Sequence, residues 1–109
     1  MISIIDTLDY FKEIYKIELQ NLPNQNFDVY IENQLFNLQI RTYDSGRSTI
    51  TISKGNDVLC EEAPFLINMN LCFYSNIEDY AFFFLTSKQL ESYNFSNLGS
   101  EINLYYGSI

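Results

Sequence analysis

The sequence predicts a mainly β fold, a single small antiparallel β-sandwich or barrel with a short N-terminal helix. From about residue 26 onward, apolar and polar side chains alternate with a period of two, as in a half-buried strand. Turn-forming residues interrupt this alternation at short intervals. The chain has 109 residues, of which 47% are hydrophobic, and this is enough for one core. We therefore expect an N-terminal extension (1–14) followed by one β domain (15–109).

The first 25 residues fit two structures. A helix is indicated by candidate caps at Asp6 or Thr7 and by an apolar stripe formed by Leu8, Phe11 and Ile14. A strand is indicated by the alternation over residues 15–20. We expect a short helix, then a strand, then a turn at Pro23, because proline cannot donate a hydrogen bond to a strand ladder.

Three strands of a meander are predicted next. Their apolar faces are formed by Phe27, Val29 and Ile31, by Phe36, Leu38 and Ile40, and by Ile50 and Ile52. The predicted turns are Asn33-Gln34, Asp44–Arg47 and Gly55–Asp57, which contain asparagine or glycine, residues that tolerate a positive φ.

The second half predicts less regular elements. Residues 65–73 alternate as a strand does, and residues 80–85 form an apolar strand. Residues 86–89 fit a capping box and predict a short helical turn. A last strand is expected over residues 102–106.

The segment Tyr80–Leu85 is apolar on both faces of the predicted strand. Tyr80, Phe82 and Phe84 share one face, and Ala81, Phe83 and Leu85 share the other. Because a domain of this size has one core, the second face must meet something else. Either it is a protein interface, for which aromatic anchors are typical, or the N-terminal segment or a loop covers it. On the interface hypothesis, the candidate partner-binding residues are Phe82, Phe83, Phe84 and Tyr105.

Charge and composition argue against several functions. Six Lys and Arg stand against 14 Asp and Glu, a net charge of −8, which disfavours binding to nucleic acid or to an anionic membrane. The absence of histidine removes the commonest general base, so we expect a non-enzyme. No metal-ligand spacing or glycine-rich phosphate loop is present, so we expect no cofactor. Cys60 and Cys72 are expected to be reduced, in a soluble protein without a secretory signal.

The segment Leu22–Phe27 reads Leu-Pro-Asn-Gln-Asn-Phe and resembles a motif of the small baseplate plug proteins of contractile-tailed phages and related tail machines. The residues that match this Pro-Asn-Gln-x-Phe motif are Pro23, Asn24, Gln25 and Phe27. The end of the chain is similar to the Gly-x-x-x-x-Leu-x-Tyr ending of the same family, through Gly99, Leu104 and Tyr106. The resemblance extends over residues 16–106.

The resemblance implies a structural, non-enzymatic virion protein made in the host cytoplasm. It would lie at the centre of the tail baseplate as a plug, bound to hub and tail tube proteins, without direct contact to nucleic acid or membrane. The four motif residues would have a structural role. The charge leaves a second hypothesis open, a free acidic inhibitor or adaptor that mimics nucleic acid. Such a mimic needs its carboxylates on one continuous face, whereas here they are spread from Asp6 to Glu101.

Overall fold

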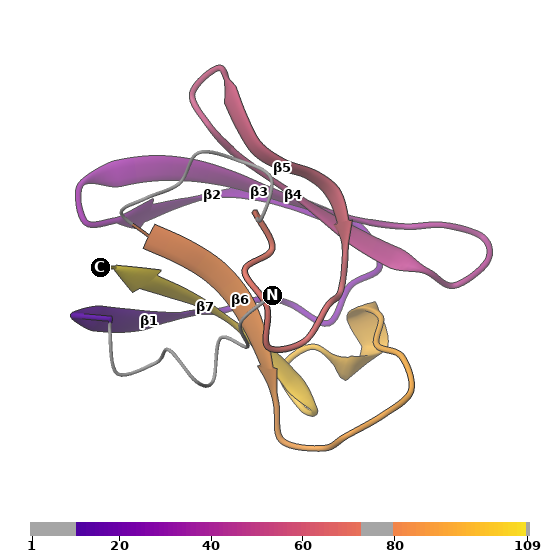
Figure 1. Ribbon diagram of the computed structural model, residues 1–109. Coiled ribbons are helices and arrows are strands. Elements are labelled where there is room, and N and C mark those ends of the chain that lie inside the picture. The colour runs from indigo at the N-terminus through magenta and orange to yellow at the C-terminus, as the bar shows by residue number, and fades with distance from the viewer. Residues whose placement is uncertain (1–10, 73–79, 109) are drawn as a thin grey trace.

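The computed structural model describes residues 11–72 and 80–108, which form two antiparallel sheets facing each other (Figure 1). Four strands build one sheet in the order β2-β3-β4-β5, and three build the other in the order β1-β7-β6. The strands are β1 (Glu13–Ile17), β2 (Gln25–Ile31), β3 (Gln34–Thr42), β4 (Ser48–Lys54), β5 (Asp57–Pro64), β6 (Tyr80–Thr86) and β7 (Ile102–Ser108). The prediction of a mainly β fold is confirmed.

The four-stranded sheet is a meander, as the alternation predicts. Each strand pairs antiparallel with the next, from Gln25 opposite Ile40 to Lys54 opposite Asp57. The β2–β3 turn lies at Glu32 and Asn33, one residue earlier than expected, and both residues have positive φ. The fourth strand, β5, was not predicted.

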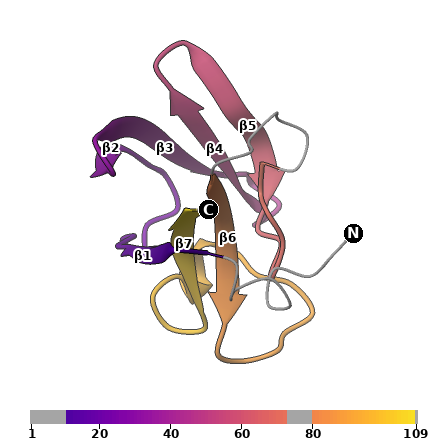
Figure 2. The ribbon, with the colours of Figure 1, turned by 60° about the vertical axis from the view of Figure 1, so that its left-hand side comes forward.

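The three-stranded sheet has β7 at its centre, between β1 and β6 (Figure 2). Across β7, Tyr15 and Phe82 both pair with Tyr106, and Ile17 and Phe84 both pair with Leu104. These residues face the four-stranded sheet, because sheet neighbours in register share a face.

The core fills the space between the sheets. From the four-stranded sheet it contains Phe36, Leu38, Ile40, Ile50 and Ile52, and from the other it contains Phe82, Phe84, Ile102, Leu104 and Tyr106, all at most 1% exposed. The rings of Phe36, Phe82 and Tyr106 lie 5.2–5.8 Å apart between centroids, at the offset or edge-on geometries that aromatic pairs prefer. An aromatic cluster therefore joins the two layers.

Two parts of the fold-class prediction are wrong. The two sheets stay separate along the described chain, so the barrel alternative is wrong and the sandwich alternative holds. The short N-terminal helix is not borne out where its segment is described, from residue 11 on: Ile14, predicted to lie on its apolar stripe, is in strand β1. The predicted caps and Leu8 lie outside the described residues. The division of the chain at residues 14 and 15 stays a prediction.

Two elements of the second half also differ from the prediction. Of the expected strand at 65–73, residues 65–72 are described, and only Ile67 forms an isolated bridge, to Phe84. The expected helical turn at 86–89 is absent, because Thr86 ends β6 and its hydroxyl accepts from the Lys88 backbone N–H. The described short helix is η2 (Phe95–Asn97), which Asn94 caps in a capping box.

Thr49 on β4 offers a stability prediction. Its side chain is 1% exposed, and its hydroxyl has no hydrogen-bond partner among the described residues. A buried hydroxyl without a partner costs free energy, so Thr49→Val should raise the free energy of unfolding by about 1 kcal/mol. Urea denaturation measures this, with Thr51→Val, a half-buried neighbour whose hydroxyl accepts from the Glu62 backbone, as the control that should lose stability.

Candidate functional site

The outer side of the three-stranded sheet carries an apolar face. Its residues alternate with the core residues along β6 and β7, and we call them the outer aromatic face: Ala81, Phe83, Leu85, Tyr105 and Gly107. Ala81 and Phe83 form a second buried cluster, with Leu85 and Tyr105 half-buried against it. The rings of Phe83 and Tyr105 are stacked, with centroids 6.0 Å apart.

Phe11, the first described residue, lies on the outer aromatic face. Its ring stacks on Phe83, with centroids 5.5 Å apart and an interplanar angle of 17°. The same ring lies against Gly107, where a Cβ atom would come within 2.8 Å of it. Gly107 has no left-handed φ that would demand glycine, so its lack of a side chain serves the close approach of the ring.

The structure separates the four predicted partner-binding residues. Phe82 and Phe84 lie in the core between the sheets, Phe83 is buried on the outer aromatic face, and Tyr105 is half-buried beside it. Two explanations were offered for a strand that is apolar on both faces. The structure shows the second of them, because Phe11 of the N-terminal segment covers the outer aromatic face at Phe83. The interface hypothesis stays a prediction.

The Pro-Asn-Gln-x-Phe motif ties the loop between the two sheets to β3. The Asn24 side chain accepts from the Thr42 N–H (3.1 Å), and the Pro23 carbonyl accepts from the Thr42 hydroxyl (2.6 Å). The Gln25 amide donates to the carbonyls of Gln20 (2.7 Å) and Leu22 (3.1 Å). The side chains of Asn24 and Gln25 thus bond to backbone groups, the Pro23 carbonyl bonds to the Thr42 side chain, and the half-buried Phe27 packs against the core. These contacts fit the structural role predicted for the motif, which stays a prediction.

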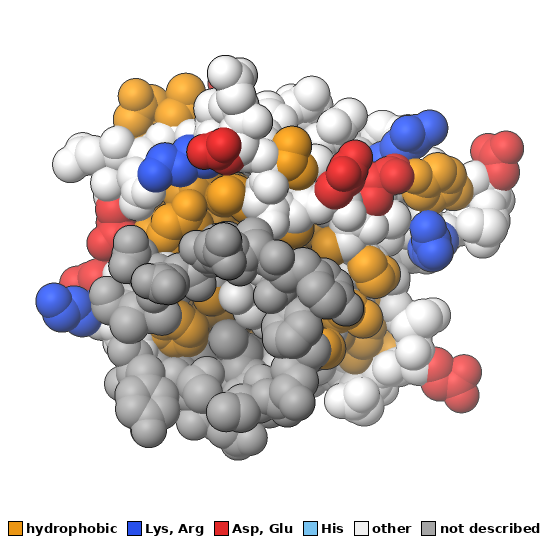
Figure 3. Space-filling view, turned by 45° about the horizontal axis from the view of Figure 1, so that its top comes forward, with side chains coloured by type: hydrophobic (Ala, Val, Ile, Leu, Met, Phe, Trp, Pro, Cys, Tyr) orange, Lys and Arg blue, Asp and Glu red, His pale blue; other side chains and the backbone are white. Residues whose placement is uncertain are grey.

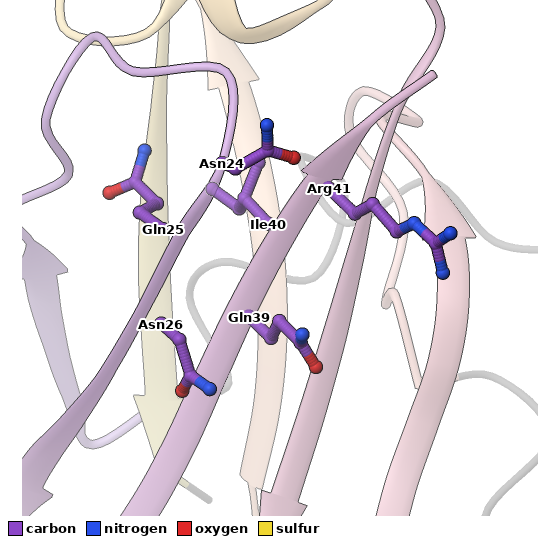
Figure 4. Close-up of a pocket in the computed structure, with 6 residues that line it drawn as sticks. All are labelled: Asn24, Gln25, Asn26, Gln39, Ile40 and Arg41. Atoms are coloured by element: carbon purple, nitrogen blue, oxygen red, sulfur yellow. The ribbon is translucent and has the colours of Figure 1, made fainter.

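A shallow hollow of about 410 Å³ opens beside the motif (Figure 4). It is lined by Asn24, Gln25, Asn26, Gln39, Ile40 and Arg41. Side-chain amides dominate this lining, and the Arg41 side chain points away from them toward β5 (Figure 4). The lining offers hydrogen-bond donors and acceptors but no nucleophile and no general base.

Substituting Gln25 should lower the free energy of unfolding more than substituting a neighbouring residue that lines the hollow. Gln25→Ala removes both bonds to the loop carbonyls, so we expect a loss of about 1–2 kcal/mol in the free energy of unfolding. Gln39→Ala, an exposed glutamine lining the same hollow, is the matched control and should change stability by less than about 0.5 kcal/mol. Equal losses in urea denaturation would contradict a structural role specific to the motif.

The two arginines of the chain both lie beside Tyr43, a cluster that was not predicted from the sequence. The guanidinium groups of Arg41 and Arg47 lie 5.0 and 5.6 Å from the ring centroid of Tyr43. The Tyr43 hydroxyl donates to Glu62, and this bond raises the pKa of the tyrosine. Arg41 is 3.9 Å from the same carboxylate, an exposed pair worth little on its own. The pairing of β3 with β4 and of β4 with β5 brings Glu62 close to Arg41 and Tyr43.

The outer face of the four-stranded sheet is mixed in character. Tyr30 is 73% exposed and pairs across the strands with Leu35, also exposed, while Asn26, Asp28 and Asn37 are linked by hydrogen bonds nearby. On the side of the molecule in Figure 3, acidic and basic side chains alternate with apolar ones. The described residues on that side form no continuous acidic face of the kind that nucleic-acid mimicry needs.

The described residues offer little for catalysis. Residues 11–72 and 80–108 contain no cluster of His, Cys, Asp or Glu that would hold a metal ion. Cys60 and Cys72 are thiols and not a disulfide. The hydrogen bond between them, together with burial, raises the pKa of the Cys72 thiol. Among the described residues, no helix has the length and apolar character to cross a membrane.

Comparison with known proteins gives a match to a protein family. Residues 14–109 match the model of a protein family described as "Cyanophage baseplate Pam3 plug gp18". No curated protein matches the chain. The match includes both sheets and the Pro-Asn-Gln-x-Phe motif, and it begins three residues after Phe11. With nearly its whole length matched, the chain belongs to the family of cyanophage baseplate plug proteins, whose role in the baseplate is structural.

Proposed function

We propose that this protein is a non-enzymatic plug at the centre of a contractile-tail baseplate, bound to the hub and tail tube proteins. The family match over residues 14–109 is the observation that carries the proposal. The structural role of this family supports a role in contact rather than in chemistry.

The outer aromatic face is our proposed contact surface. Phe83 and Tyr105 supply stacked rings on the side of the sheet that faces away from the core. Interfaces are enriched in aromatic anchors of this kind. Phe82 and Phe84, on the opposite side of the same strand, hold β6 against the core and so fix the positions of these rings.

The net charge of −8 fits a position in a DNA channel. A wall of net negative charge repels the phosphate backbone, so DNA passes without being retained. The same charge favours the second candidate function, a free acidic inhibitor that acts by protein binding.

Mass spectrometry of purified particles separates the two functions. The plug proposal expects a small, fixed number of copies per particle, and cross-links from the β6–β7 sheet to hub or tube proteins. Absence from particles, with the protein abundant in the producing cells, would exclude the plug and favour the inhibitor. Cross-links confined to the outer face of the four-stranded sheet would keep the plug but reject the proposed surface.

A further inference from the structure

We propose that Cys60 and Cys72 form a peroxide-responsive thiol pair, which oxidation converts into a disulfide that links β5 to the segment 65–72. Cys60 reacts with the oxidant, and Cys72 then displaces the oxygen from the oxidised sulfur. The bond is an intramolecular modification of the folded chain, so it goes beyond the proposed function and does not depend on it.

The two sulfur atoms meet at the core from opposite layers of the sandwich. Cys60 lies opposite Ile52 in the β4–β5 pairing, and its side chain points toward the core because sheet neighbours in register share a face. Cys72 belongs to the segment that passes beside β6 of the other sheet (Figure 1). Both cysteines pack in one core cluster, and their thiols are hydrogen-bonded to each other. The sulfur atoms are therefore in contact before any oxidation takes place.

Backbone contacts hold both cysteines in position. The Leu71 N–H donates to a carbonyl of β6 (2.8 Å), and the Cys72 N–H donates to the Asn70 side chain (3.1 Å). In the other sheet, shifts of register flank the pair of Ile52 and Cys60 on both sides. Such bulges re-aim side chains and are common beside functional groups. Closing the disulfide, with its sulfur–sulfur distance of about 2.05 Å, shortens a contact that the fold has already made.

The two thiols differ in the way that a two-step oxidation requires. Cys60 is half-buried, whereas Cys72 is only 1% exposed. The hydrogen bond from the Cys72 thiol lowers the pKa of Cys60 against the opposing effect of burial, and the Ile52 backbone N–H adds to the lowering. The same bond between the thiols keeps the proton on Cys72. Because the thiolate is the nucleophile, Cys60 reacts first.

The oxidation balances with one molecule of hydrogen peroxide. The Cys60 thiolate attacks one peroxide oxygen, the O–O bond breaks, and the leaving hydroxide takes up a proton, which gives a sulfenic acid and water. The Cys72 thiol then gives up its proton and attacks the Cys60 sulfur, the S–O bond breaks, and the hydroxide leaves as a second water. Two thiols are oxidised to one disulfide, and one peroxide is reduced to two waters.

The surroundings of Cys60 favour a small neutral oxidant. A half-buried sulfur leaves little room for a peptide disulfide such as oxidised glutathione. The net charge of −8 also repels that anion. Hydrogen peroxide is small and uncharged, so neither obstacle applies to it.

The disulfide adds a covalent link to a segment with sparse backbone pairing. The described pairing of residues 65–72 with β6 consists of the Ile67 bridge and two hydrogen bonds to carbonyls of that strand. The new bond closes the loop from Cys60 to Cys72 and so restricts the unfolded chain. For a loop of this length in a small domain, we expect the melting temperature to rise by about 10 °C.

The first test treats the purified, reduced, full-length protein with hydrogen peroxide and counts its thiols by alkylation under denaturing conditions and intact mass spectrometry. We expect two alkylated thiols before oxidation and none after it, in a monomer that has lost two hydrogen atoms. Dithiothreitol should restore both thiols and reverse the rise of about 10 °C in melting temperature. A disulfide-linked dimer, thiols that persist while free cysteine is oxidised in the same solution, or an unchanged melting temperature would overturn the proposal.

The second test separates the roles of the two cysteines with dimedone, which traps sulfenic acids. Cys72→Ala should accumulate a dimedone adduct at Cys60, whereas the wild type should not, because its Cys72 consumes the sulfenic acid. Cys60→Ala is the matched control and should form no adduct. If Cys72→Ala does not fold, Cys72→Ser replaces it with the same expected result. An adduct on Cys72 in Cys60→Ala, or none in the folded Cys72 variant after prolonged exposure, would contradict the assigned order of reaction and with it the proposal.

Discussion

Replacing Phe82 with alanine is expected to lower the free energy of unfolding by about 3–5 kcal/mol, the largest effect of any substitution considered for this protein. Phe82 is fully buried, and its ring contacts those of Phe36, Tyr80 and Tyr106 at centroid distances of 5.2–6.0 Å. Truncation removes the transfer free energy of the ring and leaves a cavity that these stiff neighbours cannot fill. Because small domains are stable by only about 5–15 kcal/mol, the variant should be close to unfolding.

Urea denaturation followed by circular dichroism measures the loss. Tyr30→Ala is the control, because Tyr30 is 73% exposed on the other sheet and should change stability by less than about 0.5 kcal/mol. A loss below about 1 kcal/mol for Phe82→Ala would contradict the assignment of its face of β6 to the core. It would favour the earlier alternative in which Phe82 itself is exposed to a partner.

The meander could be predicted because one face of each strand is buried. Burial on one face enforces an alternation such as Phe36, Leu38 and Ile40 on β3, all at most 1% exposed, and the turn residues mark where it stops. The strand β5 could not be predicted from the sequence, because its pairing with β4 is irregular. The register shifts on either side of Ile52, and Glu62 has a positive φ, so the period of two is lost within the strand.

At residues 65–72, by contrast, a strand is predicted but the structure does not form one. The alternation in this segment is regular, but a strand also needs a neighbour along its length. Here the described backbone pairing with β6 consists of the Ile67 bridge and the bonds from Asn68 and Leu71 to carbonyls of Phe84 and Phe82. The local sequence pattern does not indicate whether a sheet edge is available for the segment to pair with. The surrounding fold, and not the local sequence pattern, therefore determines that residues 65–72 do not form a regular strand.

The candidate site was predictable in part. The apolar character of both faces of Tyr80–Leu85 correctly indicated that a second surface needed an explanation. Which residue covers that surface could not be read from the sequence, because Phe11 and Phe83 are far apart in the chain. The clearest signal was Gly107, a glycine in a strand at a place without a turn, which often marks a close approach of other atoms.

Tyr106→Phe is expected to make the protein less sensitive to alkaline pH. The Tyr106 hydroxyl donates to the Glu32 carboxylate (2.8 Å), and the residue is 1% exposed. Burial, and then this hydrogen bond, raise the pKa of Tyr106 well above its usual value. A folded-state pKa above the unfolded value of about 10 means that the neutral phenol stabilises the fold below pH 10, and that this stability is lost as the pH rises further.

At pH 7 the variant should lose about 1–2 kcal/mol, because the Glu32 bond is removed while the aromatic packing remains. Between pH 10 and pH 12 its stability should fall less steeply than that of the wild type, so that the two curves converge. Urea midpoints measured across this range test the expectation. Tyr30→Phe is the control, since Tyr30 is 73% exposed on the other sheet, and its curve should run parallel to the wild type. Parallel curves for Tyr106→Phe would mean that the buried phenol of Tyr106 does not set the alkaline limit of the fold.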